Sequence, residues 1–122
     1  MNECCLAHGQ LLVHFSLTQL REFLHDLPVQ LRESSHYEGG QYLIVRADHD
    51  ARITFEKITA TEFLLAGEAS TKEGLAIICQ QVSAVLSKAQ LRHRLELHDA
   101  ADTLYQYLHY DWPIVGPTAA PE

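Results

Sequence analysis

Cysteine is scarce in this chain of 122 residues, and its placement argues against a disulfide scaffold. The three cysteines are Cys4, Cys5 and Cys79, an odd number that includes one adjacent pair. Adjacent cysteines rarely bond to each other, because disulfide geometry does not suit neighbouring residues. A small secreted protein held by disulfides is therefore disfavoured, and reduced thiols in the cytoplasm are the simpler interpretation.

Long hydrophobic runs and an early basic segment are also lacking. No apolar run reaches the roughly 18 residues of a membrane span, and the apolar stretch at residues 11–15 already contains His14. Glu3 stands near the start and no Lys or Arg precedes Arg21, so the basic flank of a secretory signal is missing. We therefore expect a cytoplasmic protein that does not bind membranes.

Basic residues are few as well. Nine Lys and Arg residues stand against sixteen Asp and Glu residues, which gives a net charge of -7 at pH 7. This balance argues against a nucleic-acid partner, since phosphate backbones attract electropositive surfaces. One local feature favours such a partner, namely the cluster of Arg92, His93 and Arg94 near several tyrosines. If residues 59–88 formed two short helices, a winged-helix arrangement would follow, but many such domains bind peptides.

Common motifs for nucleophilic catalysis and phosphate binding are missing from the sequence. There is no G-x-S-x-G elbow and no Walker or dinucleotide spacing, and Gly39 and Gly40 form an isolated pair. Cys79 falls on an apolar helical stripe, where a thiol is usually inert. We therefore predict no catalytic residue, no cofactor and no enzymatic activity.

Enough hydrophobic residues are present, 47%, to build the core of one domain. Residues 10–15 predict a short strand or the lead-in to a helix, and Ser16 and Gln19 then have the spacing of a capping box. Leucines recur at helical intervals after this box: Leu17, Leu20, Leu24, Leu27 and Leu31. Pro28 should end or kink this helix near Leu27, and residues 34–40 have the composition of a turn.

A β-hairpin is predicted at residues 41–58, because apolar and polar residues alternate on both sides of a polar turn at residues 48–50. Its first strand is suited to burial on both faces, and its second has one wet face. Residues 59–67 fit either a third strand or a short helix, and we favour the strand.

A second helix is predicted at residues 71–88, with Ser70 and Glu73 at capping-box spacing. Its apolar stripe consists of Leu75, Ile78, Cys79, Val82, Leu86 and Ala89. Alternation predicts a strand at residues 92–98. The Tyr-rich residues 103–112 favour a returning strand over a helix that starts at Asp99.

Together these elements predict an α+β fold in a single domain over residues 1–112. A mainly antiparallel sheet of four to five strands would be covered by two helices. Residues 113–122 contain three prolines and no periodicity, which predicts a flexible C-terminal tail.

Eight histidines raise the question of a metal site. Cys4, Cys5 and His8 come closest to a ligand cluster, but their spacing matches no common zinc pattern, and a frayed N-terminus is the simpler interpretation. Asp48, His49 and Asp50 offer two carboxylates and an imidazole, although a polar hairpin tip needs no metal. We predict no metal at either place.

Three further histidines lie in the predicted C-terminal strands. On a strand, His93 and His98 point to opposite faces, because they are five positions apart. If residues 103–112 return antiparallel, His109 lies across from His93 and the two form a titrating pair. Solvated or edge histidines are the simpler interpretation.

The C-terminal part concentrates aromatic side chains that carry polar groups. The predicted partner-binding residues are Tyr105, Tyr107, Tyr110 and Trp112 with the acidic Asp102 and Asp111. Such aromatic side chains are favoured at protein interfaces because they bury a large area at low entropy cost. The acidic flank would suit a basic partner, and the alternative is a sheet face packed beneath the helices.

The resulting hypothesis is a small acidic binding protein without enzymatic activity. An adaptor, an inhibitor such as an immunity protein, and a secretion-chaperone-like dimer all fit this description. The coarse order of elements is reminiscent of secretion chaperones, but no residue motif assigns the chain to that family. The second hypothesis is a histidine-based metal-binding or sensor protein, or a small metal-dependent enzyme. The lack of a recognisable nucleophile, phosphate loop or ligand spacing favours the first.

Overall fold

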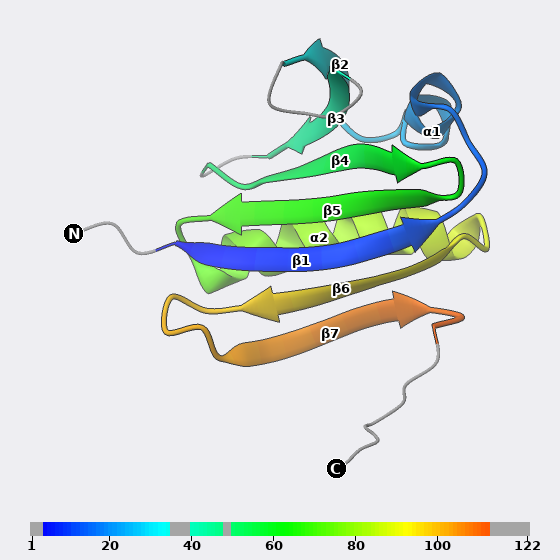
Figure 1. Cartoon of the computed structure of the whole chain (residues 1–122). Coiled ribbons are helices and arrows are strands. Elements are labelled where there is room, and N and C mark those ends of the chain that lie inside the picture. Colours follow the sequence, from blue (N-terminus) through cyan, green and yellow to red (C-terminus); the bar gives the residue numbers. More distant parts are fainter. Residues whose placement is uncertain (1–3, 35–39, 48–49, 113–122) are drawn as a thin grey trace.

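Seven antiparallel strands form one sheet, in the order β2-β3-β4-β5-β1-β6-β7 (Figure 1). The structure is a computed structural model and describes residues 4–34, 40–47 and 50–112. Its strands are β1 (Cys5–Leu12), β2 (Val29–Glu33), β3 (Gln41–Arg46), β4 (Arg52–Thr59), β5 (Glu62–Ala69), β6 (Arg92–His98) and β7 (Leu104–Tyr110). Its helices are α1 (Leu17–Phe23) and α2 (Lys72–Lys88). The predicted α+β class is confirmed, whereas the predicted four to five strands were too few.

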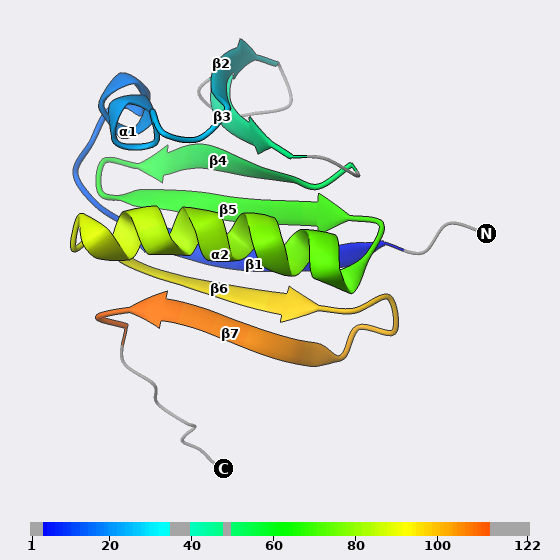
Figure 2. The ribbon, with the colours of Figure 1, turned by 180° about the vertical axis from the view of Figure 1, so that it is seen from behind.

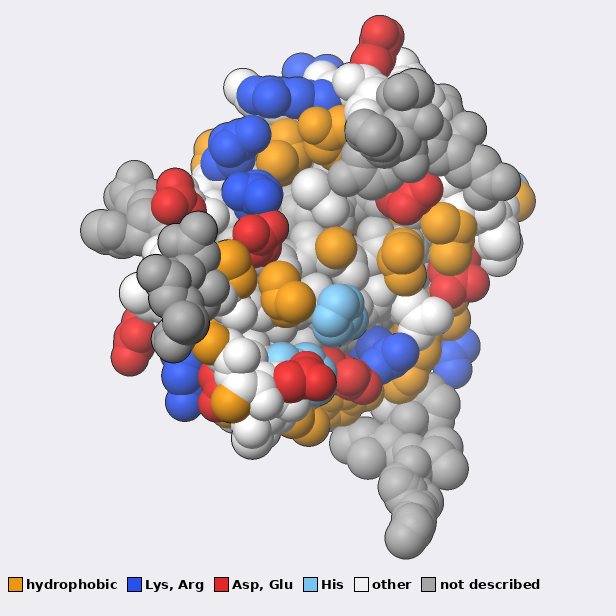
Figure 3. All heavy atoms as spheres, turned by 60° about the vertical axis from the view of Figure 1, so that its left-hand side comes forward, with side chains coloured by type: hydrophobic (Ala, Val, Ile, Leu, Met, Phe, Trp, Pro, Cys, Tyr) orange, Lys and Arg blue, Asp and Glu red, His pale blue; other side chains and the backbone are white. Residues whose placement is uncertain are grey.

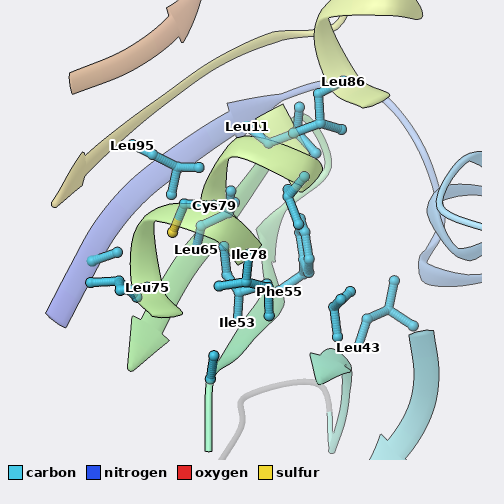
Figure 4. Close-up of a cluster of buried hydrophobic side chains, with 14 of the residues drawn as sticks. Leu11, Leu43, Ile53, Phe55, Leu65, Leu75, Ile78, Cys79, Leu86 and Leu95 are labelled. Carbon is cyan, nitrogen blue, oxygen red and sulfur yellow. The ribbon is translucent and has the colours of Figure 1, made fainter. Parts of the chain in front are cut away.

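The long helix α2 lies across one face of the sheet, and the main core fills the space between them (Figure 2). The predicted stripe from Leu75 to Leu86 is buried there. It packs against side chains of the central strands such as Phe55, Leu65 and Leu95 (Figure 4). Burial of each large apolar side chain contributes about 1.5–3 kcal/mol, so this layer holds the helix on the sheet.

The start of α2 differs by one residue from the predicted capping box. Thr71, not Ser70, is the N-cap, and its hydroxyl accepts a hydrogen bond from the Gly74 N–H at 2.9 Å. Thr71 has the extended backbone that an N-cap requires. The helix ends at Lys88 as predicted, and Ala89 is its C-cap.

The strand β1 lies in the middle of the sheet, between β5 and β6. The predicted frayed N-terminus is therefore wrong for the residues from Cys5 onward. Every second residue from Cys5 to Leu11 is buried toward α2, and the residues between them face the other side. Gly9 is one of the buried positions, and a Cβ there would collide with the Arg94 carbonyl oxygen of β6. Glycine thus permits the close approach of these two strands.

The helix α1 is shorter than the leucine spacing predicted. The capping box of Ser16 and Gln19 is confirmed, with both of its reciprocal hydrogen bonds. The helix ends at Phe23, and the chain enters the sheet as β2, where Leu31 pairs with Leu43 of β3. Since Pro28 lacks an N–H and disfavours helical backbone before it, a leucine beyond it does not extend the helical face.

Two segments that fitted either a strand or a helix are strands, namely β5 and β7. The alternative winged-helix arrangement and the alternative helix from Asp99 are therefore wrong. The β3–β4 hairpin is confirmed, and the middle of β3, from Leu43 to Val45, is buried on both faces as predicted. Neither of the two described helices combines the length and the hydrophobicity that a membrane crossing needs.

Some predictions concern residues beyond the described ranges. They are most of the turn at residues 34–40, the pair Asp48 and His49, and the C-terminal tail at residues 113–122. These remain predictions.

Candidate interaction surface

The sheet has an outer face, by which we mean the side turned away from α2 (Figure 1). Strand alternation brings four rows of side chains to the centre of this face. They are Arg52, Thr54 and Glu56 from β4; Glu62, Leu64, Ala66 and Glu68 from β5; Leu6, His8, Gln10 and Leu12 from β1; and Arg92, Arg94, Glu96 and His98 from β6. In an oblique view, hydrophobic side chains lie among charged and histidine side chains on the surface (Figure 3).

A row of hydrogen bonds crosses the outer face over three strands. The Gln10 amide donates to Glu62 at 2.8 Å, and its carbonyl oxygen accepts from Arg94 Nε at 2.9 Å. Arg94 Nη1 also donates to Glu96 at 2.6 Å. Partly buried charge-assisted bonds of this kind hold long side chains in defined positions. The row therefore gives β5, β1 and β6 an ordered polar surface.

A second ordered pair lies toward one end of the same face. Arg52 Nη2 of β4 is 2.8 Å from Glu68 Oε1 of β5, which stands directly opposite in the ladder. Both side chains are 40% exposed, so the pair contributes little to stability. The ion pair mainly holds the two side chains in place beside Leu6, which is the register partner of Glu68 on β1.

Apolar side chains lie exposed between these polar rows. Leu6 of β1 is 42% exposed and Leu64 of β5 is 43% exposed. His8 and Ala66, which are register partners, lie between them along the two strands, and both are exposed. Single exposed leucines are common, but two on adjacent strands among ordered polar groups resemble the make-up of a protein interface.

The imidazole of His98 lies between two carboxylates at the end of β6. Its Nε2 is 3.6 Å from Glu96 Oε1, and its Nδ1 is 3.6 Å from Asp102 Oδ1. The His8 ring lies edge-on to the His98 ring, with 6.0 Å between the two ring centroids. Nδ1 is buried and has no hydrogen-bond partner among the described residues. Across the described ranges, no three His, Cys, Asp or Glu side chains are grouped so as to hold a metal ion.

The six predicted partner-binding residues do not share one surface. Tyr105 is the extra residue of a bulge, because Leu97 and His98 pair with Gln106 and Leu104. The Tyr105 hydroxyl donates to the Lys72 carbonyl of α2 at 3.0 Å. Burial raises the pKa of this hydroxyl to about 12. Tyr105 therefore fastens β7 to the helix.

The other three aromatic residues divide between the two faces. Tyr110 stands opposite the buried His93 and so faces α2. Tyr107 stands opposite Glu96 on the outer face, and its ring stacks on that of His109 at 5.1 Å. Strand alternation and register thus separate Tyr110 from Tyr107.

Trp112 follows β7 and lies beside the outer face. Its ring is 5.9 Å from the guanidinium of Arg92 and 5.5 Å from that of Arg94, within the range of cation–π contacts. The indole is half-buried, so it still presents part of its surface. Trp112 thus adds an aromatic group to the row that contains Arg94.

The two predicted aspartates flank β7 at opposite ends. Asp102 precedes the strand and Asp111 follows it, and both have a left-handed backbone, with φ of 64° and 53°. Asp102 is 93% exposed at its side chain. The backbone carbonyl of Asp111 accepts a hydrogen bond from Arg92 Nε at 2.9 Å. Both carboxylates therefore lie at turns rather than inside a site.

The predicted pair of His93 and His109 is not formed. His93 is fully buried and faces Tyr110 across the ladder, whereas His109 is exposed opposite Arg94. Nδ1 of His93 donates to the Leu91 carbonyl at 2.8 Å, which leaves Nε2 to accept from the Ser83 hydroxyl at 2.8 Å. Burial lowers the pKa of His93. The simpler prediction of a solvated or edge histidine is also wrong for His93. The prediction that His93 and His98 point to opposite faces of the strand is confirmed.

The candidate cluster of Cys4, Cys5 and His8 is also divided by strand alternation. Cys5 is buried toward α2, whereas Cys4 is exposed with its sulfur 3.6 Å from Glu68 on the outer face. Cys79 is buried as predicted, and burial raises its thiol pKa to about 12. That pKa leaves almost no thiolate at neutral pH, so the thiol is a poor nucleophile.

Sequence reasoning overlooked Leu6, Leu64 and Gln10 as surface residues of interest. For β1, the signal that could have been used is the period of two over residues 5–12. The buried positions Cys5, Ala7, Gly9 and Leu11 alternate there with Leu6, His8 and Gln10, which predicts that these three side chains share the other face. Compared with known proteins, the chain matches no family model and none of the curated proteins.

Proposed function

We propose that this is a small non-enzymatic binding protein and that the outer face of its sheet binds a protein partner. The observation that carries this proposal is the exposure of Leu6 and Leu64 on a face whose polar side chains already bond to one another. Apolar groups surrounded by satisfied polar groups are typical of interfaces. Side chains ordered before binding lose less entropy on binding, which favours affinity.

The charge of the chain favours a basic partner. Its net charge of -7 would speed the encounter with a positively charged protein. On the outer face, Glu62 bonds to the neutral Gln10 amide, so its charge is available to a partner. An adaptor, an immunity-type inhibitor and a secretion-chaperone-like protein would all use such a surface.

The six C-terminal residues predicted to bind a partner differ in what they could contribute to binding at the outer face. Trp112 and Tyr107, which lie beside Arg94 and Glu96, are the aromatic groups that a partner on the outer face would meet. Asp102 and Asp111 are exposed at the turns, where charges mainly set association rate. Tyr105 and Tyr110 support β7 from the helix side.

The proposal is tested by capture from an extract of the native cells with matched variants of the full chain. Leu64→Asp places a charge on the outer face, and Ile77→Asp places the same charge on α2, where Ile77 is 54% exposed. Quantitative mass spectrometry should find a protein retained by the wild type and by Ile77→Asp and lost with Leu64→Asp. If the two variants retain the same proteins in equal amounts, the outer face is not the binding surface.

A further inference from the structure

The strand β7 forms one end of the sheet. The strand order ends with β6-β7, and within the described ranges no strand lies on the other side of β7. Alternate N–H and C=O groups of such an edge strand point away from the sheet and can pair with another strand. The edge is therefore a surface distinct from the outer face.

The two edges of the sheet differ in how well they are protected against further pairing. β2 has five residues, and two of them, Arg32 and Glu33, are charged. β7 has seven residues, Leu-Tyr-Gln-Tyr-Leu-His-Tyr, without Asp, Glu, Lys, Arg, Pro or Gly. Short length and charge are the features that discourage pairing at an edge. The bulge at Tyr105 lies at one end of β7, so β7 is the more receptive edge.

We propose that β7 pairs antiparallel with β7 of a second copy of this chain, so that one sheet continues through both. The register that overlaps the whole strand places Tyr107 opposite Tyr107 of the copy, and Leu104 opposite Tyr110. The three central pairs, formed by residues 106–108, lie clear of the bulge at Tyr105. This inference goes beyond the proposed function, because the two copies pair through the backbone edge of β7, although the Tyr107 side chain also belongs to the outer face.

The uncharged sequence of β7 suits an uncharged strand, and β7 of a second copy is such a strand. A strongly basic or acidic strand would find no opposite charge on β7, whereas two copies of β7 place no like charges opposite each other, although each chain carries a net charge of -7. Pairing would also cover Tyr107, Leu108 and Tyr110, which are half-buried in the single chain. Aromatic residues directly opposite each other stabilise antiparallel pairs.

The first test is the mass of the full chain in sedimentation velocity, over about 5–500 µM at 150 mM salt. The wild type should show a concentration-dependent species with twice the mass of the 13.8 kDa chain. Tyr107→Lys and Tyr107→Glu each place like charges opposite each other at the twofold axis and should weaken the dimer at least about tenfold. An equimolar mixture of the two variants should recover the dimer, because the charges then attract.

Three outcomes would overturn the proposal: a wild-type chain that stays monomeric throughout, a dimer unaffected by either variant, or folded variants that do not recover when mixed. Hydrogen exchange on the wild type covers the case in which a variant fails to fold. Exchange is compared at a low protein concentration, where the chain is monomeric, and at a high one, where it is dimeric. At the high concentration the amides of β7 should exchange more slowly, while those of β2 should exchange at the same rate. Equal protection of β7 at the two concentrations would contradict pairing at β7.

Discussion

His93 of β6 and Ser83 of α2 form a buried hydrogen bond of 2.8 Å, the imidazole Nε2 accepting from the hydroxyl. His93 is fully buried and Ser83 is 7% exposed. Because Nδ1 donates to the Leu91 carbonyl, both ring nitrogens are satisfied. The histidine that was considered as half of a titrating pair with His109 is thus a polar link between the helix and the sheet.

Removing one partner of this link should destabilise the fold. Ser83→Ala leaves Nε2 buried without a donor, which costs about 1–3 kcal/mol of unfolding free energy. Urea denaturation measures the change. Ser87→Ala on the same helix is the matched control, because Ser87 is only partly buried and the change in helix propensity is the same. Equal stability of the two variants would contradict the role of the bond.

The same link predicts a loss of stability in mild acid. Burial lowers the pKa of folded His93 below its ordinary value of 6.5, so the unfolded chain binds the proton more readily. The contribution of neutral, buried His93 to the free energy of unfolding is fully present above about pH 6.5. It declines as the pH falls below that value toward the lower pKa of the folded state. Urea midpoints from pH 7.5 to pH 5 should therefore fall more steeply for the wild type than for Ser83→Ala/His93→Leu. Parallel profiles would show that His93 titrates normally.

Ile77 and Ile78 are neighbours on α2 with opposite environments. Ile78 is fully buried in the core, and Ile77 is 54% exposed. Ile78→Asp buries an unpaired carboxylate and should cost more than about 3 kcal/mol, a large share of the stability of a small domain. Ile77→Asp should change the unfolding free energy by less than about 0.5 kcal/mol. Thermal unfolding of the two variants side by side checks the packing of α2, and similar melting temperatures would refute it.

The thiols should differ in reactivity. Cys4 is exposed, whereas Cys5 and Cys79 are buried, and burial raises the pKa of Cys79 to about 12. A polar disulfide reagent should therefore modify Cys4 first in the native protein and reach the other two only on unfolding. Peptide mapping after brief labelling identifies the modified residue. Rapid labelling of Cys79 without loss of fold would mean that the helix is misplaced on the sheet.

The elements that could be predicted from sequence were those with long, uninterrupted periodicity. The helical stripe from Leu75 to Leu86 and the hairpin at residues 41–58 belong to this group. β1 was largely overlooked because Gly9 and Ala7 make its buried row small, so its alternation carried little hydrophobic contrast. β2 was overlooked because Leu31 continued the helical spacing of the leucines across Pro28.

The division of the C-terminal aromatic residues was harder to predict. Strand alternation alone puts Tyr105 and Tyr107 on one face, but the bulge turns Tyr105 toward α2. The burial of His93 follows from which face of β6 meets α2, and that depends on tertiary packing. The outer face needed the order of strands, because β1 and β5 are far apart in the chain and adjacent in the sheet.

The most direct test of the proposed binding surface is the dissociation constant of the captured partner for Leu64→Asp relative to Ile77→Asp. Both variants replace an apolar side chain with Asp, at positions that are 43% exposed on β5 and 54% exposed on α2. Loss of a central apolar contact at an interface costs about 2 kcal/mol or more, so Leu64→Asp should raise Kd at least about 30-fold. Ile77→Asp should change it less than about twofold. If Ile77→Asp weakens binding as much as Leu64→Asp does, or more, the partner does not bind at the outer face.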